Sequence, residues 1–390
     1  MTALADRAKG LADRAPDPGE HYRSSLHDTR VAAALGTALG VTFTVCFATG
    51  LISHVIQNPV GWFTWPSRPA GLYRFTQGVH VATGMASIPL VVAKLWVVAP
   101  RFWARPAVRS AAHGVERLLL FPLVGGAVFL LVSGTLNTFK WYPWAFFFPH
   151  AHYWAAWIMI GGLIAHIGAK AALTWRSLRR GDPTGGELAD RASGSERRWF
   201  LGSVAAGAGA LTVATVGQTF HPLRGVSVLA PRDPDVGPQG IPINRTARSA
   251  RVTQEMADAW TLRVTGRVDR ELELTLADLQ ALPQHQATLP IACVEGWSAS
   301  ATWRGVRLRD LLELAGAQPG QHLRLQSLQA RSLYRSSPVA PNVAADRDTL
   351  LALELNGEPL ALDHGYPCRL IAPNRPGVLQ TKWVNRVQVG

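Results

Sequence analysis

The sequence is poor in cysteine and in charge. Its three cysteines, Cys46, Cys293 and Cys368, are a small and odd number, which argues against a disulfide framework. Charged residues make up only 17% of the 390 residues, and nearly all lie outside a few long apolar runs. Residues 1–30 are polar and charged throughout, so we expect no cleavable signal peptide. The length permits two or three domains, and the second half has the composition of a soluble one.

Acidic residues are outnumbered by basic ones, which gives a formal net charge of +13. A strongly basic chain is a candidate for nucleic-acid binding. Here, however, much of the positive charge lies between the apolar runs, where the positive-inside rule of membrane proteins accounts for it. We therefore expect membrane lipid, and no nucleic acid, among the partners.

Five runs are long and apolar enough to cross a bilayer, which takes roughly 20 helical residues. They are Val31–Ser53, Phe75–Ala99, Leu118–Phe139, Ala151–Ala169 and Trp199–Phe220. A single such run could be a buried core helix, but five together predict a multi-pass membrane protein.

The loops between the runs differ in charge, which predicts an orientation. Basic residues flank the inner side of the runs: Arg23, Arg30, Arg101, Arg105, Arg109, Arg117, Arg176, Arg179, Arg180, Arg191, Arg197 and Arg198. The other two loops are aromatic and carry only Arg68, Arg74 and Lys140. Basic loops face the cytoplasm and aromatic belts lie at the interfaces. We expect a bacterial inner-membrane protein with a cytoplasmic N-terminus and an extracytoplasmic region after Phe220.

The fifth run is preceded by an arginine pair, Arg197 and Arg198, in the stretch Ser195–Leu201. This stretch resembles an internal twin-arginine export signal. The alternative is an ordinary positive-inside flank. The export interpretation has a physical motive if the following domain takes up a bulky cofactor in the cytoplasm and must cross the membrane folded.

Histidines inside the apolar half predict haem. An ionisable side chain in a bilayer is costly and is therefore a functional hypothesis. His152 and His166 are 14 residues apart in one run, so their rings share a helix face and lie about 21 Å apart along the axis. Two stacked imidazoles suit two haems. His80 has the right depth to pair with His152, and His27 or His113 to pair with His166, whereas His54 is left over.

At these residues the sequence resembles the four-helix cytochromes b that serve as membrane subunits of formate dehydrogenases and nickel hydrogenases. The resemblance covers roughly residues 20–180. It implies an all-α transmembrane bundle with b-type haem, one or two per chain. It also implies an outer ligand pair of His80 with His152 and an inner pair of His27 with His166.

The second half predicts a mixed α+β domain. Strands are expected at Trp260–Val268, Gln286–Val294, His322–Leu328, Ala352–Leu355, Cys368–Ala372 and Trp383–Val389, and a helix at Leu308–Leu314. Cys293 ends a predicted strand and enters the loop Val294–Ser298. A thiolate there is a soft ligand, suited to a high-valent metal or to redox chemistry. The alternatives without metal chemistry are an inert buried cysteine and a Cys293–Cys368 disulfide.

Residues 225–390 resemble the sulfite oxidase family of molybdopterin enzymes. The matching blocks are Pro242–Thr246, Cys293–Trp297, Trp303–Val306, Asn356–Leu360, His364–Leu370 and Lys382–Val384. The resemblance implies that Cys293 binds molybdenum as the catalytic residue. It also implies that the pterin and its phosphate are held by Asn244, Arg245, His364, Arg369 and Lys382.

The loop after Cys293 departs from the animal and plant members, which bind the sulfite dianion with an arginine cluster. This loop offers Glu295 and Ser298, with no basic residue before Arg304. The substrate is therefore open between sulfite-like anions and sulfoxides, as is the direction of electron flow.

The interpretation is a membrane-bound molybdenum oxidoreductase that is connected through haem to quinone or quinol and acts on a small oxo- or sulfur-containing substrate. A haem electron-transfer subunit, or a scaffold without turnover, is the alternative, and a homo-oligomer is left open. The expected divisions are a cytoplasmic segment 1–30, the cytochrome b domain 31–180, a linker 181–198, a fifth span 199–220, a linker 221–245 and the molybdopterin domain 246–390.

Overall fold

The structure is a computed structural model that describes residues 24–102, 108, 110–178, 193–330 and 332–390. These residues form two compact units. The first comprises the chain up to Phe47, Thr83–Asn137 and Tyr142–Thr212, and the second comprises Ala48–Ala82, Thr138–Trp141 and Val213–Gly390. Several predictions lie outside the described residues: most of the segment 1–30, most of the linker 181–198, and the flanking arginines Arg23, Arg105, Arg109, Arg179, Arg180 and Arg191.

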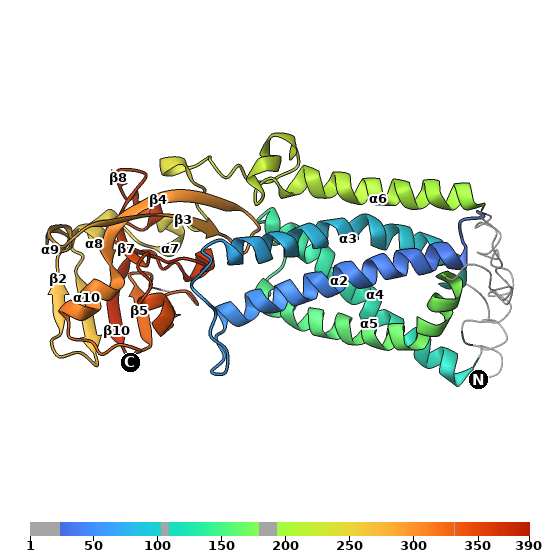
Figure 1. The fold of residues 1–390 in the computed structure, drawn as a ribbon, viewed down its shortest axis with the longest axis horizontal. Helices are drawn as coiled ribbons and strands as arrows, with labels where there is room; N and C mark the ends of the chain where they lie inside the picture. Colours follow the sequence, from blue (N-terminus) through green and yellow to red (C-terminus); the bar gives the residue numbers. More distant parts are fainter. Residues whose placement is uncertain (1–23, 103–107, 109, 179–192, 331) are drawn as a thin grey trace, which may run out of the picture. The chain divides into compact units, whose positions relative to one another are not determined.

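The five predicted spans are helices, labelled α2 to α6 in Figure 1. They are α2 (Thr29–Gln57), α3 (Leu72–Phe102), α4 (Ala111–Thr138), α5 (Phe148–Leu178) and α6 (Gly194–Val216). Each is long and apolar enough to cross a membrane. The first four are longer than their apolar runs because helical hydrogen bonding continues into the polar flanks, where hydropathy gives no signal.

Helix α6 differs at both ends from its predicted limits. It begins five residues earlier, because Ser193 and Glu196 form a capping box: the Ser193 Oγ accepts the Glu196 N–H at 3.2 Å, and a Glu196 oxygen accepts the Ser193 N–H at 2.7 Å. It ends four residues earlier, at Val216, because the Gly217 N–H turns to the Ser227 hydroxyl at 2.8 Å. The arginine pair therefore lies inside the helix rather than in a linker.

The first unit has an apolar core made by four helices. Leu35 of α2, Val97 of α3, Ala127 of α4 and Met159 of α5 are all buried in it. Phe200 of α6 packs against the same core with Leu201 and Val204. The start of α6 is thus part of the packing of this unit.

The second unit contains two sheets. Their strands are β1 (Leu262–Gly266), β2 (Leu272–Leu274), β3 (His285–Ala292), β4 (Ser298–Arg307), β5 (Leu323–Ser327), β6 (Ser336–Val339), β7 (Leu350–Leu355), β8 (Glu358–Pro359), β9 (Arg369–Ile371) and β10 (Val384–Val389). One sheet has the order β2-β1-β10-β5-β6, with β1 and β10 parallel. The other has the order β3-β4-β7-β8, with β9 also paired to β7. The predicted strands and the helix α10 (Leu308–Leu314) are confirmed, so the domain is α+β.

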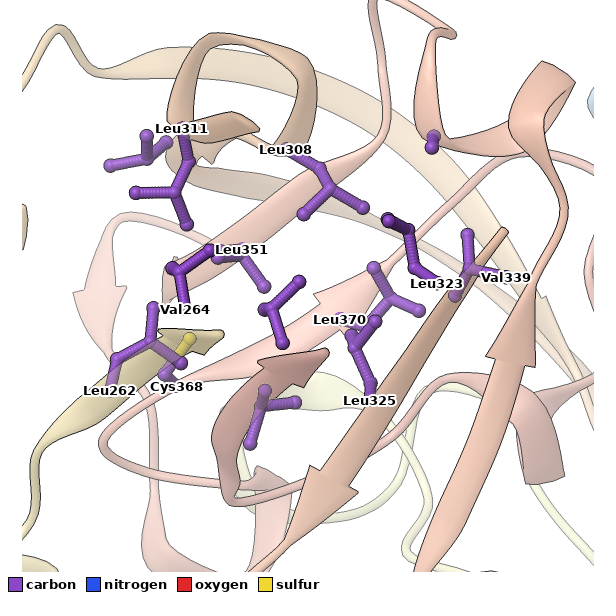
Figure 2. Packing of buried hydrophobic residues seen from close by; sticks show 14 of the residues in the cluster. Leu262, Val264, Leu308, Leu311, Leu323, Leu325, Val339, Leu351, Cys368 and Leu370 are labelled. Carbon is purple, nitrogen blue, oxygen red and sulfur yellow. The ribbon is translucent and has the colours of Figure 1, made fainter. Parts of the chain in front are cut away.

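A single core joins the two sheets (Figure 2). Leu262 and Val264 of β1 and Leu325 of β5 come from one sheet, and Leu351 of β7 and Leu370 of β9 come from the other. All five are fully buried. Buried residues alternate with more exposed ones along β1 and β5, the period of two that marks a half-buried strand, whereas β7 and β9 are buried almost throughout.

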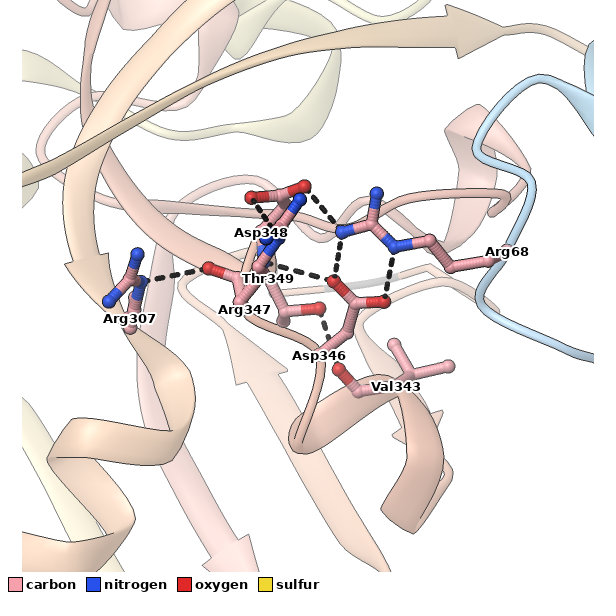
Figure 3. A network of polar contacts seen from close by, with 7 residues as sticks. All are labelled: Arg68, Arg307, Val343, Asp346, Arg347, Asp348 and Thr349. Atoms are coloured by element: carbon pink, nitrogen blue, oxygen red, sulfur yellow. Dashed lines mark hydrogen bonds and ion pairs between the residues drawn. The ribbon is translucent and has the colours of Figure 1, made fainter.

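The loop between α2 and α3, residues 58–71, is held against this domain and is here called the outer loop. The Arg68 guanidinium lies between two carboxylates, with Nε 3.1 Å from Asp346 Oδ2 and a second contact to Asp348 (Figure 3). The Asn342 amide donates to the Trp65 carbonyl at 2.9 Å. The outer loop, which hydropathy predicts only as an interfacial connection, is therefore a part of the second unit.

Candidate active site

Cys293 stands at the turn between β3 and β4. Its N–H donates to the Trp297 carbonyl at 2.8 Å, and its carbonyl accepts the Gly296 N–H at 3.0 Å. Gly296 has φ +88°, a conformation that a side chain makes costly. Ala292 and Ser298 then pair across the two strands. The sequence thus folds locally into a tight turn that fixes the sulfur at a strand end, as predicted.

The Cys293 thiol is 1% exposed and, like Cys368, is not in a disulfide. Burial raises the pKa of Cys293 far above its ordinary value, and the Glu295 carboxylate adds to the rise, while Lys140 and Arg232 oppose it. Such a thiol keeps its proton unless a metal cation replaces it, because coordination deprotonates a thiol outright. The donor fits a single protein ligand to a metal carried by a cofactor.

Two basic residues that the local sequence does not place there flank the cysteine turn. Lys140, from the loop after α4, has its Nζ 3.9 Å from Glu295, and Arg232 has a guanidinium nitrogen 3.8 Å from the same carboxylate. In the sequence, Lys140 stood out only as the single charged residue of an aromatic loop. One acid beside two bases leaves a net positive environment, which the loop sequence alone did not reveal.

Four of the predicted pterin-binding residues converge. The Lys382 ammonium donates to the Arg245 carbonyl at 2.9 Å and to the Asp363 carbonyl at 2.7 Å. The buried Arg369 donates to the His364 carbonyl at 2.9 Å, and its guanidinium carbon is 4.9 Å from the centre of the Trp303 ring. Segments that are far apart in the sequence thus bring two cations together, held by carbonyls rather than by carboxylates.

The electrostatics of this cluster point to an anion. Burial lowers the pKa of Arg369 to about 9. Burial also lowers the pKa of Lys382 well below its ordinary value, and the Arg369 charge adds to this effect, which Asp363 only partly offsets. Buried cations without a matching carboxylate are destabilised. A bound phosphate would relieve that cost, so the residues present fit the phosphate of a pterin cofactor.

His364 offers this cluster hydrogen-bonding groups rather than a charge. It is 1% exposed, and its Nε2–H donates to the Pro238 carbonyl at 2.6 Å. Burial, with the nearby Arg369 charge, lowers its pKa to about 4. The ring is therefore neutral near pH 7, with Nδ1 as an acceptor.

Asn244, the remaining predicted pterin-binding residue, is adjacent to Arg245. The Asn244 side-chain oxygen accepts the Arg245 N–H at 2.8 Å, which fixes the turn. The Arg245 guanidinium donates to the Ser332 hydroxyl at 3.2 Å and to the Ser249 carbonyl at 3.3 Å. The Asn244 carbonyl also accepts from Lys140. This contact links the cofactor-binding residues to the bases beside Glu295.

The predicted haem histidines lie in both units. In the first, His152 Nδ1 is 3.2 Å from the Ser133 hydroxyl, and His27 Nδ1 is 3.1 Å from the Val97 carbonyl. In the second, His80 Nδ1 is 3.5 Å from the Thr49 hydroxyl. Haem-ligating histidines commonly use one ring nitrogen for such a contact, which orients the other toward iron. His166 is on α5 with His152, as predicted.

The cysteine turn is attached to the ends of long helices. The Gln77 amide of α3 is 3.5 Å from the Val294 carbonyl. Just after α6, the Gln218 carbonyl accepts the Ser298 N–H at 2.8 Å, and the Thr219 hydroxyl donates to the Gly296 carbonyl. These contacts fix the turn within the second unit, and no local sequence pattern predicts them.

Comparisons with known proteins concern the carboxy-terminal domain. A family model described as the oxidoreductase molybdopterin binding domain matches residues 249–390. The uncharacterized oxidoreductase YuiH of Bacillus subtilis is 33% identical over 130 residues, which are 33% of this chain and 64% of that protein. The mitochondrial sulfite oxidase of Drosophila melanogaster is 33% identical over 145 residues, which are 31% of this chain and 25% of that protein.

Among solved structures, the sulfane dehydrogenase SoxCD from Paracoccus pantotrophus is matched at 25% identity and a TM-score of 0.33. The match covers 40% of this chain and 44% of that one. The chain thus spans less than two thirds of each of these relatives. Residues 249–390 thus match a molybdopterin-binding oxidoreductase domain and are similar to sulfite oxidases.

Proposed function

We propose that the chain is a membrane-bound molybdenum oxidoreductase. Its oxygen-atom transfer takes place at an extracytoplasmic site and is coupled through b-type haem to the quinone pool. The observation that carries this proposal is the attachment of the Cys293 turn to α3. Gln77 contacts Val294 and lies three residues, about one helical turn, before His80. The same segment therefore holds the predicted molybdenum turn and a predicted haem ligand.

In this proposal Cys293 is the protein ligand to molybdenum. Arg369 and Lys382 hold the pterin phosphate through their charge, and Asn244, Arg245 and His364 line the cofactor through hydrogen bonds. When bound, the cofactor supplies two-electron oxygen-atom transfer, and haem supplies one-electron transfer. The chain's own contribution is to hold the sulfur at the strand end and to exclude water from it.

The bases beside Glu295 bear on the substrate. Lys140 and Arg232 come from outside the part of the chain that matches the molybdopterin family. They give the cysteine turn the positive surroundings that its own sequence lacks. This favours a small anionic or strongly dipolar oxo compound, for which sulfite and methionine sulfoxide are suitable probes.

The haems would be held by His80 with His152 and by His27 with His166. The hydroxyls of Thr49 and Ser133 and the Val97 carbonyl would orient three of these rings. The proposed location is the bacterial inner membrane. The five apolar helices support a membrane protein, and the arginines that flank them support a cytoplasmic N-terminus. The twin arginines before α6 support export of the folded domain.

The test uses the full-length chain purified in detergent from a host that makes the cofactor. Molybdenum and haem are counted, and haem reduction by sulfite, or haem reoxidation by methionine sulfoxide, is followed optically. Cys293→Ser should abolish the reaction and leave the haem spectrum intact. Cys368→Ala, which changes the other buried thiol of this domain, is the matched control and should retain turnover.

Three outcomes separate the alternatives. Turnover that persists in Cys293→Ser removes this residue from catalysis. Haem without molybdenum in the wild-type chain points to an electron-transfer subunit or a scaffold. Molybdenum without haem would leave the enzyme domain standing and reject the coupling through His80 and His152.

A further inference from the structure

We propose that the start of α6 is a structural part of the inner haem site, in which Arg197 positions His27 through an ion pair with Asp28. This inference rests on the proposed function, because it concerns how one predicted haem ligand is held. It gives Arg197 a role in the folded protein that an export signal does not require.

Asp28 performs two tasks at the start of α2. One carboxylate oxygen accepts the N–H groups of Arg30 at 2.5 Å and Val31 at 3.3 Å, which caps the helix. The other oxygen is 3.5 Å from an Arg197 guanidinium nitrogen. The Asp28 side chain is only 1% exposed. A carboxylate buried to this degree needs a cation, and Arg197 provides it.

His27 is the backbone neighbour of Asp28 and is buried. Its Nδ1–H donates to the Val97 carbonyl at 3.1 Å, and its ring centre is 4.6 Å from that of Trp96. Trp96 in turn lies 5.6 Å from Phe200 of α6. Helix α6 therefore reaches His27 by two routes, an ionic one through Asp28 and an aromatic one through Trp96.

This arrangement explains a feature that the sequence left open. His27 precedes its apolar run, so nothing in the hydropathy of α2 holds its ring at the depth of His166. The ion pair and the aromatic contacts supply that restraint from two other helices. Without the Arg197 charge, the buried Asp28 would turn toward water and carry the adjacent histidine with it.

The two arginines of the pair are equivalent in sequence but not in structure. Arg197 is partly buried and pairs with Asp28, whereas Arg198 is exposed. Arg198 lies with Trp199 along a shallow groove of α6. Arg198→Gln is therefore a matched control for Arg197→Gln, since both remove one positive charge from the same turn.

The experiment compares haem content per chain in detergent-solubilised membranes of full-length protein, by pyridine haemochrome, with a redox titration. Wild type should hold two haems, and Arg197→Gln should fall toward one with the outer haem unchanged. Asp28→Asn should do the same, because asparagine still caps the helix but cannot pair with arginine. Arg198→Gln should match wild type. The double variant Arg197→Gln with Asp28→Asn should hold as much haem per chain as either single variant, since both substitutions remove the same contact.

Several results would overturn the inference. These are full haem content in Arg197→Gln, equal losses in Arg198→Gln, loss of both haems, or additive losses in the double variant. An export defect would strike both arginine variants and is scored separately, by protease access to the carboxy-terminal domain in spheroplasts. A wild-type chain with only the outer haem would reject the inner site and leave the molybdenum and outer-haem proposals standing.

Discussion

Asn374 fastens the outer loop to the carboxy-terminal domain, and its replacement should release that loop. Its side-chain oxygen accepts the Tyr73 N–H at 2.6 Å, and its amide donates to the Pro66 carbonyl at 2.6 Å. Its own N–H donates to the Ala70 carbonyl at 3.1 Å. The residue is 3% exposed and has φ +53°. Asparagine tolerates this left-handed conformation better than most residues.

The cost can be worked out from these contacts. Removing the Asn374 side chain loses two hydrogen bonds and leaves the buried Tyr73 N–H unsatisfied, together about 3 kcal/mol. Alanine adds about 1 kcal/mol because its Cβ disfavours the left-handed conformation, whereas glycine does not. Asn374→Gly and Asn374→Ala therefore separate the hydrogen bonds from the backbone conformation.

The assay is hydrogen exchange of residues 65–73 in the full-length chain, read by mass spectrometry. If the outer loop opens locally, about 3 kcal/mol corresponds to exchange about a hundredfold faster in Asn374→Gly. Asn374→Ala should be about fivefold faster again. Strands β5 and β10, which belong to the other sheet than β9, the strand just before Asn374, serve as internal controls. Unchanged hydrogen exchange in the outer loop, or equally faster exchange throughout the domain, would refute the conclusion that the Asn374 hydrogen bonds hold this loop locally.

Two further predictions follow from single positions. A Cβ at Gly50 would lie 2.9 Å from the His80 ring, so Gly50→Ala should displace that ring and alter the outer haem spectrum; Gly40→Ala, with no atom within 4 Å, should not. Equal spectra for both variants would contradict the close approach. Burial lowers the pKa of His364 from 6.5 to about 4, so the folded domain binds a proton on this ring less readily than the unfolded chain does. The free energy of unfolding should therefore be unaffected by this group above pH 6.5 and fall as the pH drops toward 4, by at most about 3 kcal/mol. In His364→Gln, the unfolding temperature should fall less steeply with decreasing pH than in wild type. A profile identical to wild type would show that another group causes the acid destabilisation.

Much of the architecture follows from the sequence alone. Long apolar runs indicate α2 to α5 because no other backbone structure satisfies its own hydrogen bonds over that length in lipid. Alternating apolar residues indicate β3 and β5, since a strand buries every second side chain. Cys293 could be placed at a strand end because an apolar run stops there and a glycine-containing turn follows.

The ends of α6 show where sequence interpretation fails. Hydropathy marks only apolar residues, so the capped first turn at Ser193 was assigned to a linker. The exit at Gly217 was assigned to the helix, because the hydroxyl of Ser227 that competes for its N–H lies ten residues away. Boundaries of this kind depend on individual hydrogen bonds rather than on periodicity.

The surroundings of the candidate site were decided only by tertiary structure. Lys140 and Arg232 reach Glu295 from segments separated from it by tens of residues or more, and no local pattern joins them. Arg197 and Arg198 look alike in sequence, yet only the packing of α6 against α2 gives one of them a buried partner. The sequence by itself determined which elements form and which thiol is the candidate ligand, because these depend on neighbours in the chain. The charges that act on that thiol, and the contacts that hold the histidines, depend on neighbours in space.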